Sequence, residues 1–501
     1  MKTLHWYDHV SINLFWLGLN IRNNSVNSVI LPFMVSNLAA PDIRNTALGG
    51  INTVGLVIAM LVQPAMGILS DRSTSRFGRR RPFIFAGVLL DLVCLALIAV
   101  SSSYWFLVGA VLLFQFSSNV SHGALQGLMP DLVPEDQRGV SSGVKSIFEL
   151  VPVVLVALVI SKLVAAGYFL AAVAATGAAL LIIMLLTMLL VKEKPLAQKP
   201  DIPLRPAMGR VLGVLVGIGL GAAAGLLSGG VIGGLAGAAA LPLAGEPAAL
   251  AILVGLGGMV AMVGAVIIGV WAGAFVTIGQ EPAGRRPGEG FIRSTLGDLR
   301  VFAGRHGNFT WWVANRLLFL TAITSLQKFA PFFLMYAFKI NIEESTSTTA
   351  NLFLVVGLCT LVTALPSGWL SDHFGSRRLL EVSGVLAGLG AFLLLGTIWL
   401  PNLGLIYVAG VVLGLATGLF VTINWALGTR LVPPAEAGRY MGISNLAGAG
   451  AGIVGTGIGG PMADALEKVQ PGLGYFALFA SYGVLFVLST VSLQGIQKST
   501  S

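Results

Sequence analysis

The 501-residue chain is 55% hydrophobic and 10% charged, with a mean hydropathy of +0.87, and this composition excludes a soluble globular protein. Apolar stretches of about 20 residues, the length of a bilayer-spanning helix, recur from end to end. The net charge of +9 would suggest nucleic-acid binding in a soluble protein. In a membrane protein basic residues collect in cytoplasmic loops, so we expect no nucleic-acid partner and an all-α polytopic membrane fold.

Twelve of the apolar stretches form two sets of six, separated by an insertion. We place the first set at residues 11–37, 48–69, 83–101, 104–127, 143–162 and 168–191, and the second at 309–338, 347–369, 379–399, 403–427, 441–463 and 473–494. Between them, two basic linkers flank apolar segments at 211–242 and 248–278. The sequence predicts a six-helix bundle over 1–191, linkers with a Gly-rich two-helix insert over 192–308, and a second six-helix bundle over 309–501, with about 14 helices in all.

The distribution of Lys and Arg predicts the orientation. With the N-terminus inside, only Arg44, Lys162, Lys339 and Lys468 fall in external loops, and only Arg22, Arg316 and Lys328 fall within spans. The remainder lie on the cytoplasmic side, as the positive-inside rule requires. Both linkers are basic, so the insert crosses twice, with its tip near Leu243–Pro247. We expect a multi-pass protein of the cell (plasma or inner) membrane with both termini cytoplasmic and an uncleaved first span.

A short basic stretch between the second and third spans, here called the basic loop, organises the rest of the chain. It reads Gly67-Ile-Leu-Ser-Asp71-Arg72-Ser-Thr-Ser-Arg76-Phe-Gly78-Arg79-Arg80-Arg81-Pro82. Its charged residues cannot lie in hydrocarbon, so it must lie in water. A weaker copy, Pro366-Ser-Gly368-Trp-Leu-Ser-Asp372-His-Phe-Gly375-Ser-Arg377-Arg378, follows the eighth span, which indicates two related halves.

A second repeated pattern supports this internal duplication. Leu132-Val-Pro134-x4-Gly139-x3-Gly143 follows the fourth span, and Leu431-Val-Pro433-x4-Gly438-x3-Gly442 follows the tenth. Parallel six-helix repeats are typical of transporters that rock around a site between their halves.

The first insert segment carries a glycine at every fourth residue from Gly213 to Gly237, here called the glycine ridge. Such a small-xxx-small face lets helices approach closely in lipid, and apolar low-complexity filler is the alternative interpretation. The pattern leaves the partner of the ridge open. It is the second insert segment, with Gly255, Gly269 and Gly273, or the main body, or another copy of the chain.

The basic loop, its weaker copy and the six-plus-six arrangement resemble the major facilitator superfamily. The long form of the loop, with Pro130-Asp131-Leu-Val-Pro134 after it, is similar to the plant sucrose–proton and glycoside–pentoside–hexuronide cation symporter branches. The resemblance covers the chain except the insert. It implies a cytoplasmic latch in which Asp71 contacts the start of the eleventh span, with Arg79 and Arg138 as ionic partners. The implied gate comprises Gly67, Asp71, Arg72, Gly78, Arg79, Arg138 and Asp372, although His373 replaces an arginine in the second copy.

Amide groups within the first span are candidates for solute binding, because polar groups are costly in hydrocarbon. Asn13, Asn20, Asn24 and Asn27 follow one helical face, here called the asparagine stripe. Asn20, Asn24 and Asn27 suit a cavity for hydroxyl-rich solutes, and helix packing is the alternative. Arg22 points to the opposite side.

Three charged residues within the first bundle are candidates for proton coupling or an ion pair. We pair Arg22 with Glu149 of the fifth span, because the resemblance implies that helices one and five pack together. Glu149 is also a candidate for the coupling proton. Asp91 of the third span is a rival proton site, and a satisfied packing carboxyl is the alternative for it.

Further candidates lie on the fourth, seventh and tenth spans. Asn119, His122 and Gln126 form an i, i+3, i+7 polar face suited to substrate contact or to polar packing. Asn424 and Trp425 form a pair of the kind that sugar sites use, although an aromatic residue in a span more often packs. Arg316 is a candidate for coupling or an ion pair, with snorkelling to the helix end as the alternative.

The sequence contains no motif of an ATPase or a metal enzyme. It has no Gly-Lys dipeptide, hence no Walker A loop, and neither His-Glu-x-x-His nor Cys-x-x-Cys. Cys94 and Cys359 both fall inside apolar runs, so no disulfide framework is indicated. We expect no enzyme activity, no catalytic residues, no metal and no cofactor, with energy from a proton or sodium gradient.

These patterns favour a secondary active transporter that moves a small polar organic solute by alternating access. A sugar or glycoside in symport with protons is the favoured cargo, so the expected partners are a small-molecule solute, a coupling ion and the lipid bilayer. One alternative is an exporter of another organic solute on the same fold. The other is a non-transporting membrane assembly factor that docks through the glycine ridge.

Overall fold

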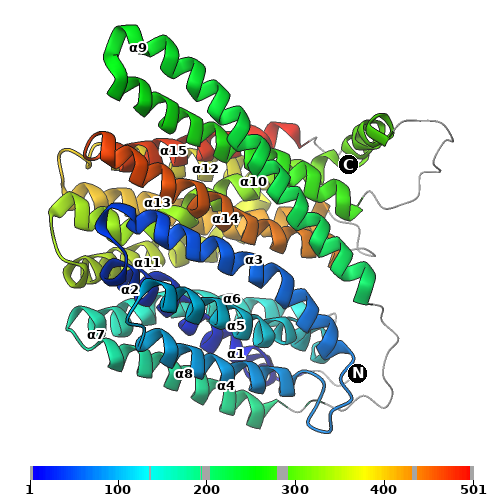
Figure 1. The fold of residues 1–501 in the computed structure, drawn as a ribbon. Helices are drawn as coiled ribbons and strands as arrows, with labels where there is room; N and C mark the ends of the chain where they lie inside the picture. Colours follow the sequence, from blue (N-terminus) through cyan, green and yellow to red (C-terminus); the bar gives the residue numbers. More distant parts are fainter. Residues whose placement is uncertain are drawn as a thin grey trace. The chain divides into compact units, whose positions relative to one another are not determined.

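The computed structural model describes residues 4–134, 137–191, 193, 204–278, 291–431 and 437–496, although not every side chain within the helices (Figure 1). Over these residues it is helical and contains no strand. Twelve of the described helices are long and apolar enough to cross a membrane. The predicted all-α, multi-pass membrane fold is confirmed.

Two compact units divide the chain. One comprises Met1–Gly209 and Ala330–Gly357, and the other comprises Arg210–Phe329 and Leu358–Ser501. The boundaries cut through α10 (Phe291–Phe338) and α11 (Ile342–Phe374). The predicted division at residues 191 and 308 therefore stays a prediction.

The first unit contains a helix for each of the six spans predicted in the first half. These are α1 (Trp6–Ser25) with η1 (Val26–Ile30) and α2 (Leu31–Leu38), α3 (Arg44–Asp71), α4 (Arg81–Ala99), α5 (Tyr104–Leu132), α6 (Arg138–Leu155) with η4 (Val156–Ile160) and α7 (Ser161–Ala165), and α8 (Phe169–Leu190). The end of α10 and the start of α11 complete this unit.

The second unit contains the insert and most of the second half. Its elements are α9 (Leu204–Ile278), the greater part of α10 and α11, α12 (Ser376–Leu395), α13 (Leu403–Leu431), α14 (Ala437–Val469) and α15 (Leu473–Ser492).

Two single turns of π-helix interrupt long helices of the first unit. In η1 the N–H of Leu31 bonds to the carbonyl of Val26, and in η4 the N–H of Ser161 bonds to the carbonyl of Val156. Proline lies near each turn, Pro32 after η1 and Pro152 before η4. Because proline lacks an N–H, it leaves a carbonyl unpaired and favours such irregular turns, which often occur at functional sites.

The insert folds as the predicted hairpin. α9 runs through it without a formal break, but Gly245 has the non-helical angles φ 81° and ψ 174°, within the predicted tip. Two candidate spans, Gly219–Pro242 and Gly245–Gly269, lie on either side of this turn.

The glycine ridge packs against the second insert helix, which settles the partner that the sequence left open. A Cβ at Gly225 would lie 2.5 Å from the carbonyl oxygen of Ala261, and one at Gly237 would lie 2.7 Å from that of Ala249. Gly221, Gly229 and Gly233 face the same helix as closely. Backbone-to-backbone contact of this kind stabilises helix pairs in lipid, where no hydrophobic force drives association. Gly213 lies outside the described side chains.

The second insert helix also packs against α14 and α15 within the second unit. A Cβ at Gly258 would overlap the side chain of Met462, and one at Gly255 would lie 3.6 Å from Leu466 and 4.0 Å from Ala477. Gly255 therefore faces the main body of the unit, whereas the ridge glycines face their own hairpin.

We expect Gly229→Ala to destabilise the insert and Gly230→Ala to leave it unchanged. A methyl group at Gly229 would overlap the Gly257 carbonyl, whereas Gly230 faces open space. Overpacking of this kind costs roughly 1–3 kcal/mol. The midpoint of thermal unfolding in detergent measures the difference, and equal midpoints for the two variants would contradict the packing of the ridge.

Candidate functional site

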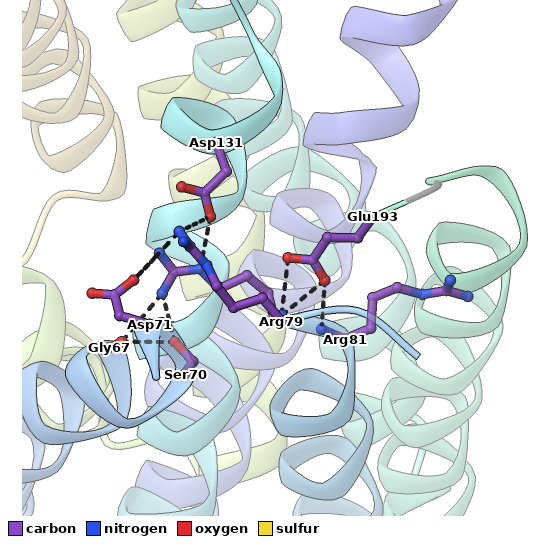
Figure 2. Close-up of polar contacts among 8 residues, drawn as sticks. Gly67, Ser70, Asp71, Arg79, Arg81, Asp131 and Glu193 are labelled. Carbon is purple, nitrogen blue, oxygen red and sulfur yellow. Dashed lines mark hydrogen bonds and ion pairs between the residues drawn. The ribbon is translucent and has the colours of Figure 1, made fainter. Parts of the chain in front are cut away.

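The basic loop folds back onto the ends of α3 and α5 through four charged residues, here called the basic-loop network (Figure 2). Asp71, the last residue of α3, pairs with Arg80, and its Oδ1 lies 3.5 Å from Arg79 Nη2. Asp131 of α5 pairs with both arginines, and its Oδ2 lies 3.0 Å from Arg80 Nε. Two carboxylates and two guanidinium groups thus neutralise one another and tie α3 to α5 through the loop.

Arg80 is the most buried member of this network. Its guanidinium donates to the Ser70 hydroxyl at 2.5 Å and to the Gly67 carbonyl at 3.2 Å. Gly127 of α5 leaves room for it, since a Cβ there would overlap the guanidinium carbon. These contacts give the basic loop a defined conformation in addition to its positive charge.

Glu193, just beyond α8, holds the loop from a third element. Its carboxylate accepts the Arg80 N–H at 2.9 and 2.8 Å and the Arg81 N–H at 3.2 Å, at the start of α4. Gly78, with φ +107°, passes so close that a Cβ would lie 2.5 Å from Glu193 Oε2. Burial raises the pKa of Glu193, although the two amides and the Arg80 charge oppose the shift.

The structure places some of the residues of the implied gate and leaves others undescribed. Arg79 lies within ion-pair distance of Asp71, as the resemblance implies. Arg72 follows the last residue of α3, and its N–H bonds to the carbonyl groups of Leu69 and Ser70. The side chains of Arg138 and Asp372 lie outside those described. A contact between Asp71 and the eleventh span would join the two units and stays a prediction.

Arg22 pairs with Asp91 of α4, so the predicted Arg22–Glu149 pair is wrong. Both side chains are fully buried. Asp91 Oδ2 accepts from Arg22 Nη1, its Oδ1 accepts from the Ser117 hydroxyl of α5, and Arg22 Nη2 donates to Asn23 Oδ1 at 2.9 Å. A buried guanidinium pairs with a carboxylate that is buried at the same place, because an unpaired charge there is very costly. Glu149 is not in that enclosure.

Glu149 instead joins a partly exposed group on α1, α5 and α6, here called the Trp16–Glu149 cluster. Glu149 Oε1 lies 3.3 Å from Lys145 Nζ, one turn earlier on α6, and their side chains are 39% and 30% exposed. Lys145 Nζ lies 4.2 Å from the centre of the Trp16 ring. Trp16 in turn meets His122 of α5 edge to face, with ring centres 5.4 Å apart. The cluster brings a base, a cation and a carboxylate to one aromatic surface.

The predicted polar face of α5 does not share one environment. Asn119 is buried and donates to the Gln115 carbonyl of its own helix at 2.7 Å. His122 is half-buried against Trp16, and Gln126 is exposed. Among these residues His122 alone is placed in the Trp16–Glu149 cluster.

The asparagine stripe divides into a packing part and a lining part. Asn13 is fully buried, and its Nδ2 donates to the Ser141 hydroxyl at 2.7 Å and the Ser141 carbonyl at 3.2 Å, which joins α1 to α6. Asn20 and Asn24 are half-buried and donate to carbonyls one turn earlier. Asn27 lies in η1 and is also half-buried.

A pocket of the first unit lies where both π turns meet the start of α11, here called the hydroxyl-lined pocket. Its lining comprises Asn24, Ser28, Val29, Val153, Val156, Ala157, Ser161, Thr346, Thr349, Ala350 and Phe353. The polar groups are four hydroxyls and one amide, and the remainder are apolar. Such a lining offers hydrogen bonds to hydroxyl groups and apolar contact to a carbon skeleton, with no fixed charge.

A second polar group lies in the other unit, around Asn424 of α13. Asn424 is fully buried, its Oδ1 accepts from Arg316 Nη1 at 3.0 Å, and its Nδ2 donates to Asn315 Oδ1 at 2.9 Å. The Arg316 guanidinium carbon lies 5.4 Å from the centre of the Trp425 ring, which is 41% exposed. Arg316 therefore reaches across to a neighbouring helix, whereas snorkelling would extend it along its own.

A sequence profile described as Major Facilitator Superfamily matches residues 15–283, 205–456 and 317–495 of the chain. The chain belongs to the Major Facilitator Superfamily. The solved structure of a D-xylose-proton symporter covers 98% of each chain with a TM-score of 0.63 at 14% identity. That of the peptide transporter POT in complex with sulfate covers 97% of this chain and 94% of its own, with a TM-score of 0.62 at 13% identity. At these identities the likeness shows the fold alone.

Curated relatives of this superfamily member match over a shorter stretch. It is 30% identical over 112 residues to sucrose transport protein SUC3 of Arabidopsis thaliana and 31% identical over 115 residues to sucrose transport protein SUT1 of Oryza sativa subsp. japonica. Each match covers 18% of this chain, and 19% and 21% of the relatives. The match thus spans about a fifth of the length of the relatives.

Several residues of these sites were missed by reasoning from the sequence. In the sequence Glu193 is one of several charged residues of a linker, and Lys145 is one of many basic residues, so neither stood out. Ser117 and the pocket hydroxyls gave no signal, because serine and threonine are common in spans and often bond to their own helix. Only Asp131 had a signal, since it belongs to the Pro130–Pro134 pattern that carried the resemblance.

We expect Asp91→Asn to be strongly destabilising and the double change Arg22→Met with Asp91→Leu to recover much of the loss. The single change leaves the Arg22 charge buried without a partner, at a cost of roughly 3–5 kcal/mol, whereas the double change removes both charges. Thermal unfolding in detergent measures this. The losses of stability caused by changes at Arg22 and at Glu149 should add. A non-additive loss for Arg22 with Glu149, together with an additive loss for Arg22 with Asp91, would contradict the Arg22–Asp91 pair.

We expect Gly78→Ala to destabilise the basic loop more than Gly167→Ala destabilises its own turn. Both glycines have positive φ, +107° and +82°, so both variants carry backbone strain. Only the methyl group at Gly78 would also displace the Glu193 carboxylate, since Gly167 has nothing within 4 Å. Equal losses of thermal stability would show that the Glu193 contact does not hold the loop.

Proposed function

We propose that the chain is a secondary active transporter of small hydroxyl-rich organic solutes, with a sugar or glycoside as the favoured cargo. Membership of a superfamily of transporters supports transport as such. The partial similarity to sucrose transport proteins supports this solute class, and it is limited to about a fifth of their length.

The observation that carries the proposal is the chemistry of the lining of the hydroxyl-lined pocket, whose free volume in this conformation is about 20 Å³, so that a sugar can enter only if the lining helices separate. Asn24 and four serine or threonine hydroxyls line it together with valine, alanine and phenylalanine. A sugar presents hydroxyl groups around its edge and C–H groups on its faces, so neutral donors and acceptors beside apolar side chains match it. The pocket also lies at both π turns, where a helix can change its hydrogen bonding at low cost.

For the coupling ion we propose a proton taken up at Glu149. Its carboxylate is partly exposed, so that water can reach it. Lys145 Nζ lies 3.3 Å away and forms an ion pair with the ionised carboxylate, and this pair would be lost when Glu149 takes up a proton. Asp91 is fully enclosed by Arg22 and Ser117, and we assign it a packing role. The Trp16–Glu149 cluster then links the ion to α1, which also lines the hydroxyl-lined pocket.

Uptake by proteoliposomes tests both parts. With an imposed inward proton gradient we expect accumulation of at least one member of a panel of sugars and glycosides. The Glu149→Gln variant should lose this accumulation but should still let the solute move down its own concentration gradient. Glu381→Gln is the matched control. Glu381 forms the same i, i+4 pair, with Arg377, and is 38% exposed.

Different results identify which part fails. If no solute enters under any gradient, transport of this class is excluded and the assembly-factor alternative gains. If a solute accumulates under a sodium gradient alone, or if Glu149→Gln accumulates as well as Glu381→Gln, the assignment of the proton to Glu149 is wrong.

A further inference from the structure

A groove between α4 and α8 of the first unit is separate from the sites described above. The two helices pack side by side (Figure 1), and the groove between them has a volume of about 400 Å³. Leucine, valine, alanine and glycine alone line it, from residues 92–100 and 170–181. Small-molecule sites have volumes of roughly 300–1,000 Å³, so the groove is large enough to hold an apolar ligand.

Small side chains on both helices open the groove. Ala96 and Ala99 lie one turn apart on α4, and Ala174 and Ala178 lie one turn apart on α8. The helices are close at Gly177, since a Cβ there would lie 3.2 Å from a leucine side chain of α4. The groove therefore belongs to the helix pair itself: the helices touch at Gly177, and the alanines beside it leave space that larger side chains would fill.

The groove occupies only the half of the α4–α8 interface that lies away from the basic loop. In the other half, Ile84 and Val88 of α4 and Leu180 and Met184 of α8 belong to one buried core cluster. The open part spans roughly 12 Å of α4 and roughly 16 Å of α8, at about 1.5 Å per residue. One leaflet contributes roughly 15 Å of the hydrocarbon core, so the groove has the depth of a single leaflet.

Polar and aromatic residues place the mouth of the groove at the membrane surface. Exposed Tyr168 directly precedes α8, and exposed Ser102 and Trp105 follow α4 in the chain. Tyrosine and tryptophan collect at the level of the lipid headgroups, where their polar atoms meet water and their rings meet hydrocarbon. The groove therefore begins just below the headgroups and runs towards the middle of the bilayer, as a lipid acyl chain does.

An acyl chain fits this groove better than a helix of a partner protein. A partner helix would contact α4 and α8 across the whole bilayer, and it would need small residues along that full length. In the half beside the basic loop the exposed residues are bulky instead, namely Phe85 and Leu89 on α4 and Leu186 and Leu189 on α8. A flexible chain needs only the depth of one leaflet, which is what the alanines provide.

We propose that the groove binds one acyl chain of a phospholipid, from the leaflet that lies away from the basic loop. The apolar lining contacts the chain along its length, and the headgroup lies at the mouth, beside Tyr168 and Ser102. The orientation predicted from Lys and Arg makes this the outer leaflet. The site involves α4 and α8 alone, so the proposal goes beyond the proposed function and does not depend on which solute is transported.

Photo-crosslinking of the full-length chain in phospholipid vesicles tests the proposal. The probe is a phosphatidylethanolamine with a diazirine in the middle of one acyl chain, and peptide mapping locates the labelled residues. We expect residues 92–100 and 170–181 to be labelled at least fivefold more than the exposed residues of α4 and α8 beside the basic loop. Ala96→Phe should lower this ratio at least fivefold, because the ring fills the groove. Ala86→Phe is the matched control, since Ala86 is exposed on the same helix and does not line the groove.

A second pair of variants repeats the comparison on α8. Ala178 is exposed and lines the groove, whereas Ala171 is exposed and does not, so only Ala178→Phe should lower the ratio. Uniform labelling of the exposed residues, or labelling that Ala96→Phe and Ala178→Phe leave unchanged, would show bulk lipid only and overturn the proposal. Displacement of the probe by a sterol, or a cross-link between two chains at the groove, would also overturn it, because the ligand would then be a rigid ring system or a second copy.

Discussion

A charge placed among apolar helices must find its counter-charge within the protein, and the first unit is assembled around that requirement. Arg22 is fully buried on α1, and it is neutralised because α4 brings Asp91 to it, while Ser117 of α5 donates to the other oxygen of Asp91. The three helices are therefore held in one register by a pair whose separation would strand a charge. The same logic governs the basic loop, where Asp71 and Asp131 bind the two arginines that join the ends of α3 and α5.

This requirement also explains where polar groups without charge are found. With Arg22 satisfied on one side of α1, its other side is free to present amides, and Asn24 reaches the hydroxyl-lined pocket. Trp16 of the Trp16–Glu149 cluster lies on the same helix, so that a movement of α1 affects both the cluster and the pocket. A device for coupling an ion to a solute needs such a shared element, because each ligand can bias only a motion in which its own contacts change.

Much of the fold could be predicted from the sequence, and the reasons are physical. Span length, the positions of Lys and Arg, and the repeated loop are set by the bilayer itself, which imposes the same constraints on every chain. The glycine spacing predicted a close interface, but its partner required the structure, because a small-residue face specifies only how near a neighbour lies. The Arg22–Glu149 pairing failed for a similar reason. A sequence shows that a buried charge needs a partner, whereas the choice between Glu149 and Asp91 depends on which side of α1 each helix covers.

Two arginines that lie within membrane spans differ in the groups that surround them. Arg22 and Arg316 both lie on the first helix of their half, and both bond to an asparagine. Arg22 also has a carboxylate and is closed off, whereas Arg316 has a neutral amide, an aromatic ring and partial exposure. The two arginines therefore differ in charge balance among the described residues: Arg22 and Asp91 neutralise each other, whereas neutral and aromatic groups hold Arg316.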